Sequence, residues 1–205
     1  GHRLVNWDPS LQTALSDLEV TNEEENSYIW KIKYKHKDGF IVVATTRPET
    51  LLGDMALAVN PSDKRFSHLI GKKASLPLCN RLIPIVADSY VDPEFGTGVV
   101  KITPGHDFND YDLGKRHGLH MDEDMQCHAG TEADFMPISI FNKTVEVIGV
   151  APKKFHGMDR FEARKVILED LKKDKFLVSE KEYESTLPYG DRSDQILEPL
   201  LTDQW

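Results

Sequence analysis

The sequence is poor in cysteine and has no long apolar run. Only Cys79 and Cys127 occur in 205 residues, which argues against both a disulfide framework and a four-cysteine zinc site. No apolar stretch approaches the roughly 20 residues that cross a bilayer, and the N-terminus lacks the pattern of a signal peptide. We therefore expect a protein without membrane association and with a cytoplasmic location.

The sequence also has no excess of basic residues. Its formal net charge is −9, which argues against a domain that holds nucleic acid by its general electrostatic field. Lysine clusters within 31–37, 72–73, 153–154 and 172–175 leave local phosphate contacts open, although a solvated face is the ordinary interpretation of each. With 40% hydrophobic and 29% charged residues, the composition is typical of a soluble globular protein.

The apolar pattern predicts many short strands and few helices. Residues 28–36 alternate as a half-exposed strand does, and Asp38 and Gly39 supply a turn into a strand at 40–46 that we expect to be buried on both faces. We predict a mainly β fold with peripheral helices, built on a bent, barrel-like sheet. Further strands are predicted at 55–59, 73–78, 81–88, 98–103, 137–141 and 144–150, and helices at 48–52, 62–70, 108–117 and 160–174.

The stretch 96–118, GTGVVKITPGHDFNDYDLGKRHG, places polar groups directly after an apolar run. A phosphate-binding loop is excluded by spacing, because Lys101 stands where a dinucleotide fingerprint needs its third glycine and no Gly-Lys-Ser/Thr ending follows. A metal site is a minor alternative, since none of the familiar zinc spacings is present. Its candidate ligands would be His106, Asp107, Asp110, His117, His120, Cys127 and His128.

A small polar pocket is the third interpretation of this stretch. Asp107 suits the N-cap of the following helix and Asp110 its first turn, so both aspartates have a structural explanation. Lys101 and Thr103 have none, because they share one face of an apolar strand that should be mostly covered. On pattern alone, a paired core lysine and a ligand pocket remain equally open.

Two motifs make the sequence recognisable. ATTRPETLLGD, at 44–54, and GTGVVKITPGHDFNDYDLGKRH together closely resemble the editing domain of valyl-tRNA synthetases, and the flanks at both ends agree. The isoleucine and leucine enzymes share the TTRPET theme, whereas Lys101, Thr103 and the HDFNDY segment mark the valine version. Gly105 is one departure, since valine enzymes usually carry alanine there; the acidic loop at 121–134 is another.

The resemblance implies an insertion excised from a class I synthetase, with the bent-sheet fold of that editing-domain type. Its start at Gly1 and end at Trp205 within family sequence fit an excised fragment. We expect residues 1–25 to be a connecting arm, 26–185 the editing domain with an exposed loop at 121–134, and 186–205 the returning arm. The HIGH and KMSKS signatures of the ATP-using body do not occur, so we expect no aminoacylation, no cofactor and no metal in this chain.

The function implied by the resemblance is hydrolysis of the ester in mischarged Thr-tRNA(Val), with threonyl-adenylate as a second candidate substrate. An apolar pocket for valine cannot strongly reject the nearly isosteric threonine, and valyl-tRNA synthetase is itself the standard example of this limit. A second site that hydrogen-bonds the threonine hydroxyl can select for it. A non-catalytic module that binds the tRNA acceptor end is the alternative function.

The resemblance also implies roles for individual residues. Asp110 would hold the α-ammonium group, while Lys101 and Thr103 would meet the threonine hydroxyl. No serine or cysteine triad is apparent, so a positioned water would attack the ester. The expected partners are the tRNA(Val) acceptor end carrying threonine and the rest of the synthetase chain, with the protein a monomer. Residues expected to line the pocket or bind the terminal adenosine are Thr45, Thr46, Arg47, Glu49, Thr50, Phe95, His106 and Asp107.

Overall fold

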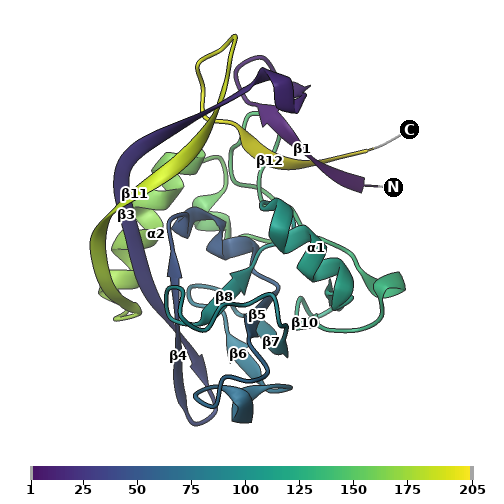
Figure 1. The fold of residues 1–205 in the computed structure, drawn as a ribbon, viewed down its shortest axis with the longest axis vertical. Coiled ribbons are helices and arrows are strands. Elements are labelled where there is room, and N and C mark those ends of the chain that lie inside the picture. Colours follow the sequence, from purple (N-terminus) through teal and green to yellow (C-terminus); the bar gives the residue numbers. More distant parts are fainter. Residues whose placement is uncertain (1, 204–205) are drawn as a thin grey trace.

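The structure is a computed structural model that describes residues 2–203, and it confirms the predicted mainly β class. A seven-stranded sheet in the order β11-β3-β6-β7-β5-β8, with β4 also paired to β3, bends strongly around the core (Figure 1). Its strands are β3 (Val20–His36), β4 (Gly39–Thr45), β5 (Ala56–Val59), β6 (Lys73–Ser75), β7 (Leu82–Ala87), β8 (Val99–Ile102) and β11 (Leu177–Gly190). A three-stranded sheet contains β1 (His2–Asp8), β2 (Thr13–Leu15) and β12 (Glu198–Asp203). A two-stranded sheet pairs β9 (His120–Met121) with β10 (Cys127–His128).

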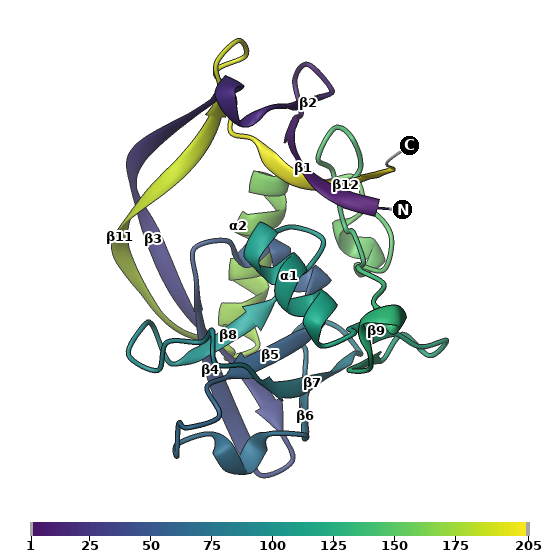
Figure 2. The same ribbon diagram turned by 45° about the vertical axis from the view of Figure 1, so that its right-hand side comes forward.

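The long strands β3 and β11 form an antiparallel ribbon that arches over one side of the molecule (Figures 1 and 2). The alternating pattern of β3 places Trp30, Ile32 and Tyr34 in the core. The neighbouring β4 was expected to be buried on both faces, and this prediction is wrong, because burial alternates along the strand: Val42 and Ala44 are only partly buried and Phe40 is 49% exposed. The ammonium group of Lys33 covers the exposed ring from 4.3 Å, which lowers the cost of leaving it in water.

The strand β5 is short and wholly apolar. All four residues of β5 are buried, and β5 pairs in parallel with β7 and antiparallel with β8. In this register Leu57 lies opposite Lys101, so a lysine enters the sheet from a strand whose neighbours are aliphatic. The core beside β5 therefore contains one charge that needs a partner.

Two α-helices pack beside the sheet, α1 next to β8 and α2 next to the 3-10 helix η2 (Pro48–Gly53) and β11. Helix α1 (Phe108–Arg116) begins at Asp107, whose carboxylate accepts the N–H of Asp110 at 2.9 Å, and Gly118, with φ +56°, follows its end. Helix α2 (Arg160–Lys173) begins at Asp159 in the same way and buries Ala163, Ile167 and Leu171. The predicted cap at Asp107 is confirmed, and in α2 Val166 is only partly buried.

The segments at 137–150 and 62–70 differ from the predictions. Neither 137–141 nor 144–150 forms a strand; the two segments make only isolated bridges, Phe141 with Val147 and Glu146 with Asp159. Their alternating residues instead turn side chains such as Ile140 and Val147 into the core without a continuous ladder. The segment 62–70 contains only the one-turn 3-10 helix η3 (Ser67–Leu69). The other 3-10 helices are η1 (Asp17–Glu19), η2 (Pro48–Gly53), η4 (Glu132–Asp134) and η5 (Lys153–Phe155).

The two ends of the described chain lie side by side. β1 and β12 pair from His2 with Asp203 to Trp7 with Glu198, which places both ends at one corner of the molecule. Strand β3 continues through residue 25 and β11 through residue 185, so no structural break marks the predicted arm boundaries. The division at 1–25, 26–185 and 186–205 stays a prediction.

Candidate active site

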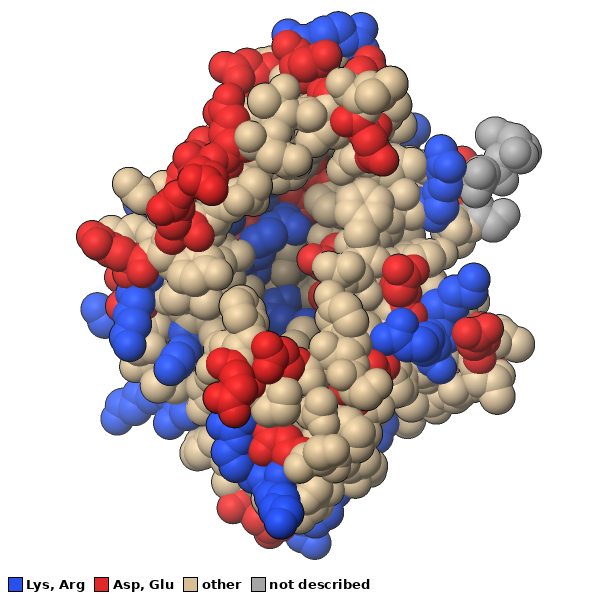
Figure 3. Space-filling view, viewed as in Figure 1, with Lys and Arg blue, Asp and Glu red and all other residues tan. Residues whose placement is uncertain are grey.

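A cavity of about 460 Å³ opens beneath the β3–β11 ribbon. Figure 3 shows it as a deep hollow with lysine or arginine atoms at its floor. Its walls come from the end of β4 and the start of η2, the loop before β8, β8 itself, the first turn of α1 and β11. It brings together every predicted site residue except Glu49, namely Thr45, Thr46, Arg47, Thr50, Phe95, Lys101, Thr103, His106, Asp107 and Asp110.

A buried hydrogen-bond network surrounds Lys101 at the floor of this cavity. The Lys101 ammonium group donates to Asp54 Oδ1 at 2.7 Å, Thr50 Oγ1 at 2.9 Å and Thr103 Oγ1 at 2.5 Å. The Thr103 hydroxyl in turn donates to Asp54 Oδ1 at 2.6 Å. All three N–H groups of Lys101 thus have acceptors within the protein, so this lysine is a paired core lysine at the edge of a pocket.

Asp54 is the residue at this site that the sequence analysis missed. Its side chain is completely buried, and besides Lys101 and Thr103 it accepts the phenol O–H of Tyr34 at 2.5 Å. Burial and the Asp54 carboxylate raise the pKa of Tyr34 well above its ordinary value, which keeps the phenol a donor. The sequence did hold a signal for Asp54. Lys101 stands among apolar residues, and a buried ammonium group needs an acidic partner. Asp54, the last residue of the motif at 44–54, could have been named as that partner.

Asp110 lies on the cavity wall beside this network. One of its oxygens, Oδ2, accepts the backbone N–H of Thr103 at 2.9 Å, and within residues 2–203 no hydrogen bond reaches Oδ1. The side chain keeps some contact with solvent through the cavity, but protein atoms surround it on most sides. Burial, and then the nearby negative charge of Asp107, raise the pKa of Asp110 to about 8. Such a carboxyl is ready to ionise against a cation that enters the cavity.

Arg47 and Glu49 belong to a second network beside the cavity. Arg47 donates to the carbonyl oxygen of His106 at 3.0 Å and to the carboxylate of Glu198. Glu49 is completely buried, and Arg164 binds both of its oxygens at 2.9 and 3.0 Å. Glu49 therefore holds the side chains of Arg47 and Arg164 in place. The Arg47 side chain is 29% exposed, so a ligand could contact Arg47 but not the buried Glu49.

His106 is a neutral, buried histidine. Its Nε2 accepts the N–H of Ile140 at 3.0 Å, and the rings of His106 and Phe141 form a T-shaped pair with centroids 5.0 Å apart. Burial, followed by the positive charges of Arg47 and Lys101, lowers the pKa of His106 to about 3. With Nε2 occupied, the imidazole is not placed to act as a base toward the cavity.

Other nucleophiles and ligands are also accounted for. Burial raises the pKa of both Cys79 and Cys127 to about 11, so neither is an activated thiol. His117 pairs with Asp88 at 2.8 Å and His128 with Asp122 at 2.6 Å. In the part of the chain that is described, no group of three or more His, Cys, Asp or Glu residues could hold a metal ion, and no helix has the length and hydropathy needed to span a membrane.

Comparison with known proteins agrees with this geometry. The family model described as "Leucyl-tRNA synthetase, editing domain" matches residues 62–172. The chain belongs to this editing-domain family of the aminoacyl-tRNA synthetases. The editing domain thus has the fold type that its motifs implied.

Relatives of the editing domain fall in the valine branch. This chain is 52% identical over 207 residues to Valine--tRNA ligase of Legionella pneumophila (strain Paris), and the match covers 100% of this chain but 21% of that protein. It is 51% identical over 207 residues to the enzyme of Dechloromonas aromatica and 52% identical over 214 residues to that of Acinetobacter baylyi, covering 100% of this chain and 20% and 22% of those proteins. The chain thus spans about a fifth of the length of these relatives, and the resemblance to valyl-tRNA synthetases is confirmed.

The backbone at Gly105, where the resemblance leads us to expect alanine, leaves little room for a side chain. A Cβ at position 105 would lie 2.0 Å from the carbonyl oxygen of Ile138. Real Cβ atoms do not approach backbone oxygens this closely, so alanine here would require the segment around Ile138 to shift. That segment carries the N–H of Ile140 that holds His106.

Proposed function

We propose that the cavity hydrolyses the ester of threonine mischarged onto tRNA(Val), with threonyl-adenylate as a second substrate. One observation carries the proposal: in a cavity of about 460 Å³, the Asp110 carboxyl, whose Oδ1 has no hydrogen-bond partner among residues 2–203, lies beside a buried hydroxyl-rich network. An aminoacyl ester presents an ammonium group and a side chain on the same carbon. Asp110 and the network around Thr103 offer complementary groups to both.

The α-ammonium group of the substrate binds Oδ1 of Asp110. The positive charge lowers the pKa of Asp110 from about 8, so the carboxyl ionises on binding and a charge-assisted pair forms. Asp107 supports this geometry as the cap of α1, since it holds the backbone N–H of Asp110. Its exposed position also leaves it near the mouth of the cavity.

The threonine hydroxyl enters the hydrogen-bond network of Thr103. Thr103 Oγ1 already donates to Asp54 and accepts from Lys101, which leaves one lone pair for a further donor. Valine has no hydroxyl to donate there. Lys101 acts in this proposal as a positioning residue, because its three donors are engaged and it orients Thr103 and Thr50.

The chemical step uses water. A water molecule attacks the ester carbonyl carbon, the bond from this carbon to the ribose oxygen breaks, and that oxygen takes up a proton as threonine and tRNA separate. Among the described residues, His106 and the two cysteines are not suited to nucleophilic attack. Positioning of the ester by Asp110 and Thr103, and exclusion of bulk water by the ribbon, supply the rate enhancement. Arg47, Thr46 and the 64% exposed Phe95 form the wall proposed for the adenosine.

Release of labelled threonine from Thr-tRNA(Val), with Val-tRNA(Val) as the matched substrate, tests this proposal on the 205-residue chain. We expect the chain at high concentration to release threonine faster than spontaneous hydrolysis and to spare valine. Binding of tRNA without faster release would instead indicate a non-catalytic acceptor-end module. Equal release of both amino acids would reject selection by the hydroxyl.

A further inference from the structure

A second cavity, of about 570 Å³, lies apart from the first. Its walls come from the loop between β6 and β7, the turn between β9 and β10, and the segment 149–156 that contains η5. The volume falls within the range of small-molecule sites. No residue lines both cavities, so nothing proposed above for the first cavity occupies the second.

A buried cation, Arg81, stands at the wall of the second cavity and is only 3% exposed. Its Nη1 donates to the carbonyl oxygens of Leu52 at 3.0 Å and Asp54 at 3.2 Å. Within residues 2–203, Nε is buried without a hydrogen-bond partner, Nη2 makes no hydrogen bond, and no carboxylate forms an ion pair with the guanidinium group. The edge of the guanidinium group formed by Nε and Nη2 is therefore free.

The charge of Arg81 is not balanced by the acid beside it. The Asp54 carboxylate pairs with Lys101 at 2.7 Å, and Arg81 reaches only the backbone oxygen of Asp54. Cys79, which also lines the second cavity, stays a neutral thiol, because burial raises its pKa to about 11. A buried charge without a counter-charge is unfavourable, so an anion that enters the cavity would relieve this penalty at Arg81.

The remaining wall of the second cavity is mainly apolar, with two charged side chains of opposite sign. Lys153 is exposed and, in the part of the chain that the structure describes, makes no ion pair, while Asp124 adds one negative charge. A ligand for this wall has an apolar body, and Asp124 would repel a second negative charge on it. The apolar residues of the wall are Leu78, Met125, Val150, Ala151 and Pro152.

We propose that the second cavity binds a small carboxylate with an apolar body. The two carboxylate oxygens accept hydrogen bonds from Nε and Nη2 of Arg81, the paired geometry in which arginine binds carboxylates. The apolar body lies against Val150 and Pro152. A phosphate monoester, with more than one negative charge, suits the cavity less, because Asp124 also lines it. The inference is independent of Thr-tRNA(Val) hydrolysis, since the two cavities share no residue.

The test compares two probes that differ in charge. 4-Phenylbutanoate carries a carboxylate, and 4-phenylbutanamide has nearly the same shape without the charge. NMR titration of the 205-residue chain at pH 7 should show the carboxylate binding at least about 10-fold more tightly, the value of hydrogen bonds to a charged group. The Arg81 Nε–H signal reports the place of binding: it should move downfield with the carboxylate and stay in place with the amide.

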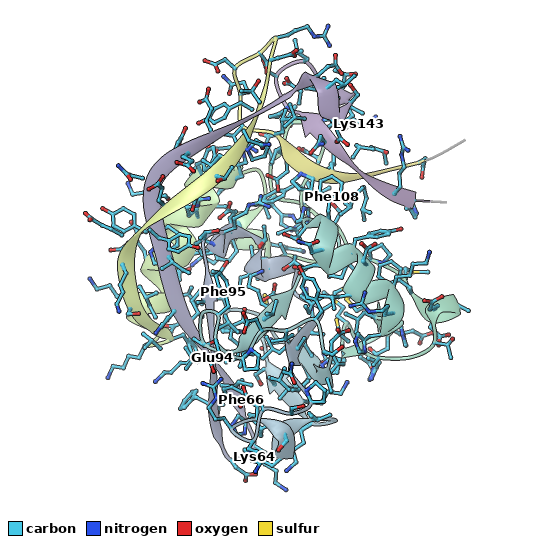
Figure 4. All side chains as sticks on the ribbon, viewed as in Figure 1. Lys64, Phe66, Glu94, Phe95, Phe108 and Lys143 are labelled. Atoms are coloured by element: carbon cyan, nitrogen blue, oxygen red, sulfur yellow. The ribbon has the colours of Figure 1, made fainter. Side chains whose placement is uncertain are left out.

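Variants at exposed positions test the site without disturbing Arg81, which also holds the backbone of Leu52 and Asp54. Asp124→Asn should tighten binding of 4-phenylbutanoate about 2- to 5-fold, because it removes one exposed like charge, and should leave the amide unchanged. Lys153→Met should weaken the carboxylate by a similar factor. Lys64→Met is the matched control: Lys64 lies at the lower end of the molecule in Figure 4 and lines neither cavity.

Four results would overturn the inference. Equal affinity for the two probes would show that the cavity recognises no anion. Absence of binding by either probe would leave Arg81 with only its support of the backbone. Carboxylate binding that does not move the Arg81 Nε–H signal would place the ligand elsewhere, and an affinity unchanged in both Asp124→Asn and Lys153→Met would separate the bound carboxylate from this wall.

Discussion

The ammonium group of Lys101 lies 2.7 Å from the carboxylate of Asp54, with the lysine side chain 8% exposed and the aspartate completely buried. Lys101 comes from β8, at one end of the strand order, and Asp54 is the residue that follows η2. The pair therefore ties the two motifs of the sequence together inside the core. Breaking one partner of such a pair costs far more than removing both.

The first prediction concerns this pair. Lys101→Met should destabilise the protein by about 3–5 kcal/mol, because it leaves Asp54 buried without its partner. Lys101→Met combined with Asp54→Asn should recover much of this loss. Urea unfolding of both single variants and the double variant measures the coupling, and additive losses would show that the two charges do not depend on each other.

The second prediction concerns selectivity. Thr103→Val keeps the shape of the side chain and the backbone N–H that Asp110 accepts, but removes the hydroxyl. We expect deacylation of Thr-tRNA(Val) to fall about 10-fold, the value of one or so hydrogen bonds, while slow hydrolysis of Val-tRNA(Val) stays the same. Thr144→Val, at an exposed position, is the control. Equal losses on both substrates would assign Thr103 to the chemical step or to the fold.

The third prediction concerns protons. Because the pKa of Asp110 is about 8 without substrate, the carboxyl is mostly protonated at pH 7 and ionises when an ammonium group binds. Binding of a non-hydrolysable amide analogue of threonyl-adenosine at pH 7 should release up to about one proton. Calorimetry in buffers of different ionisation enthalpy measures this number. Asp110→Asn should abolish the release, and an unchanged value in that variant would place the titrating group elsewhere.

The fourth prediction concerns stability and its dependence on pH. The pKa of Asp110 is raised from an ordinary 3.8 to about 8 on folding, so the folded state favours the protonated carboxyl. The contribution of the protonated Asp110 carboxyl to the free energy of unfolding is complete below pH about 4 and is lost as the pH rises toward 8. Asp110→Asn should therefore stabilise the protein relative to wild type at pH 8, by on the order of 1 kcal/mol, and not at pH 4. Thermal unfolding of the variant and of wild type at pH 4 and at pH 8 measures this difference. A variant that is equally destabilised at both pH values would refute the raised pKa.

The sequence predicted the elements whose pattern is local. The alternation of β3, the capped start of α1, the helix at α2, and the concentration of the motif residues around one cavity were predicted from the chain. The strands expected at 137–141 and 144–150 fail because their apolar residues pack against the core without a partner strand that completes a ladder. A pattern of alternating apolar and polar residues indicates which side chains are buried, and it indicates a strand only where another strand is present to pair with it.

The partners of the site residues were less accessible to prediction. Lys101 was left open between a core lysine and a pocket lysine, and the structure shows a paired lysine at the pocket floor whose acid lies 47 positions earlier. His106 gave no sequence signal of its partner, since the N–H of Ile140 belongs to an irregular segment. Such pairings depend on chain crossings that periodicity does not encode. The roles of Asp110, Lys101 and Thr103 in catalysis stay predictions.

The measurement that tests the central claim most directly is the rate of Thr-tRNA(Val) deacylation by Asp110→Ala and by wild type, side by side. If Asp110 anchors the α-ammonium group, kcat/KM should fall about 10- to 100-fold, the value of one hydrogen bond to a charged group, while circular dichroism and thermal unfolding show an intact fold. If a folded Asp110→Ala variant hydrolysed Thr-tRNA(Val) with the kcat/KM of wild type, this would contradict the assignment of this cavity as the editing site.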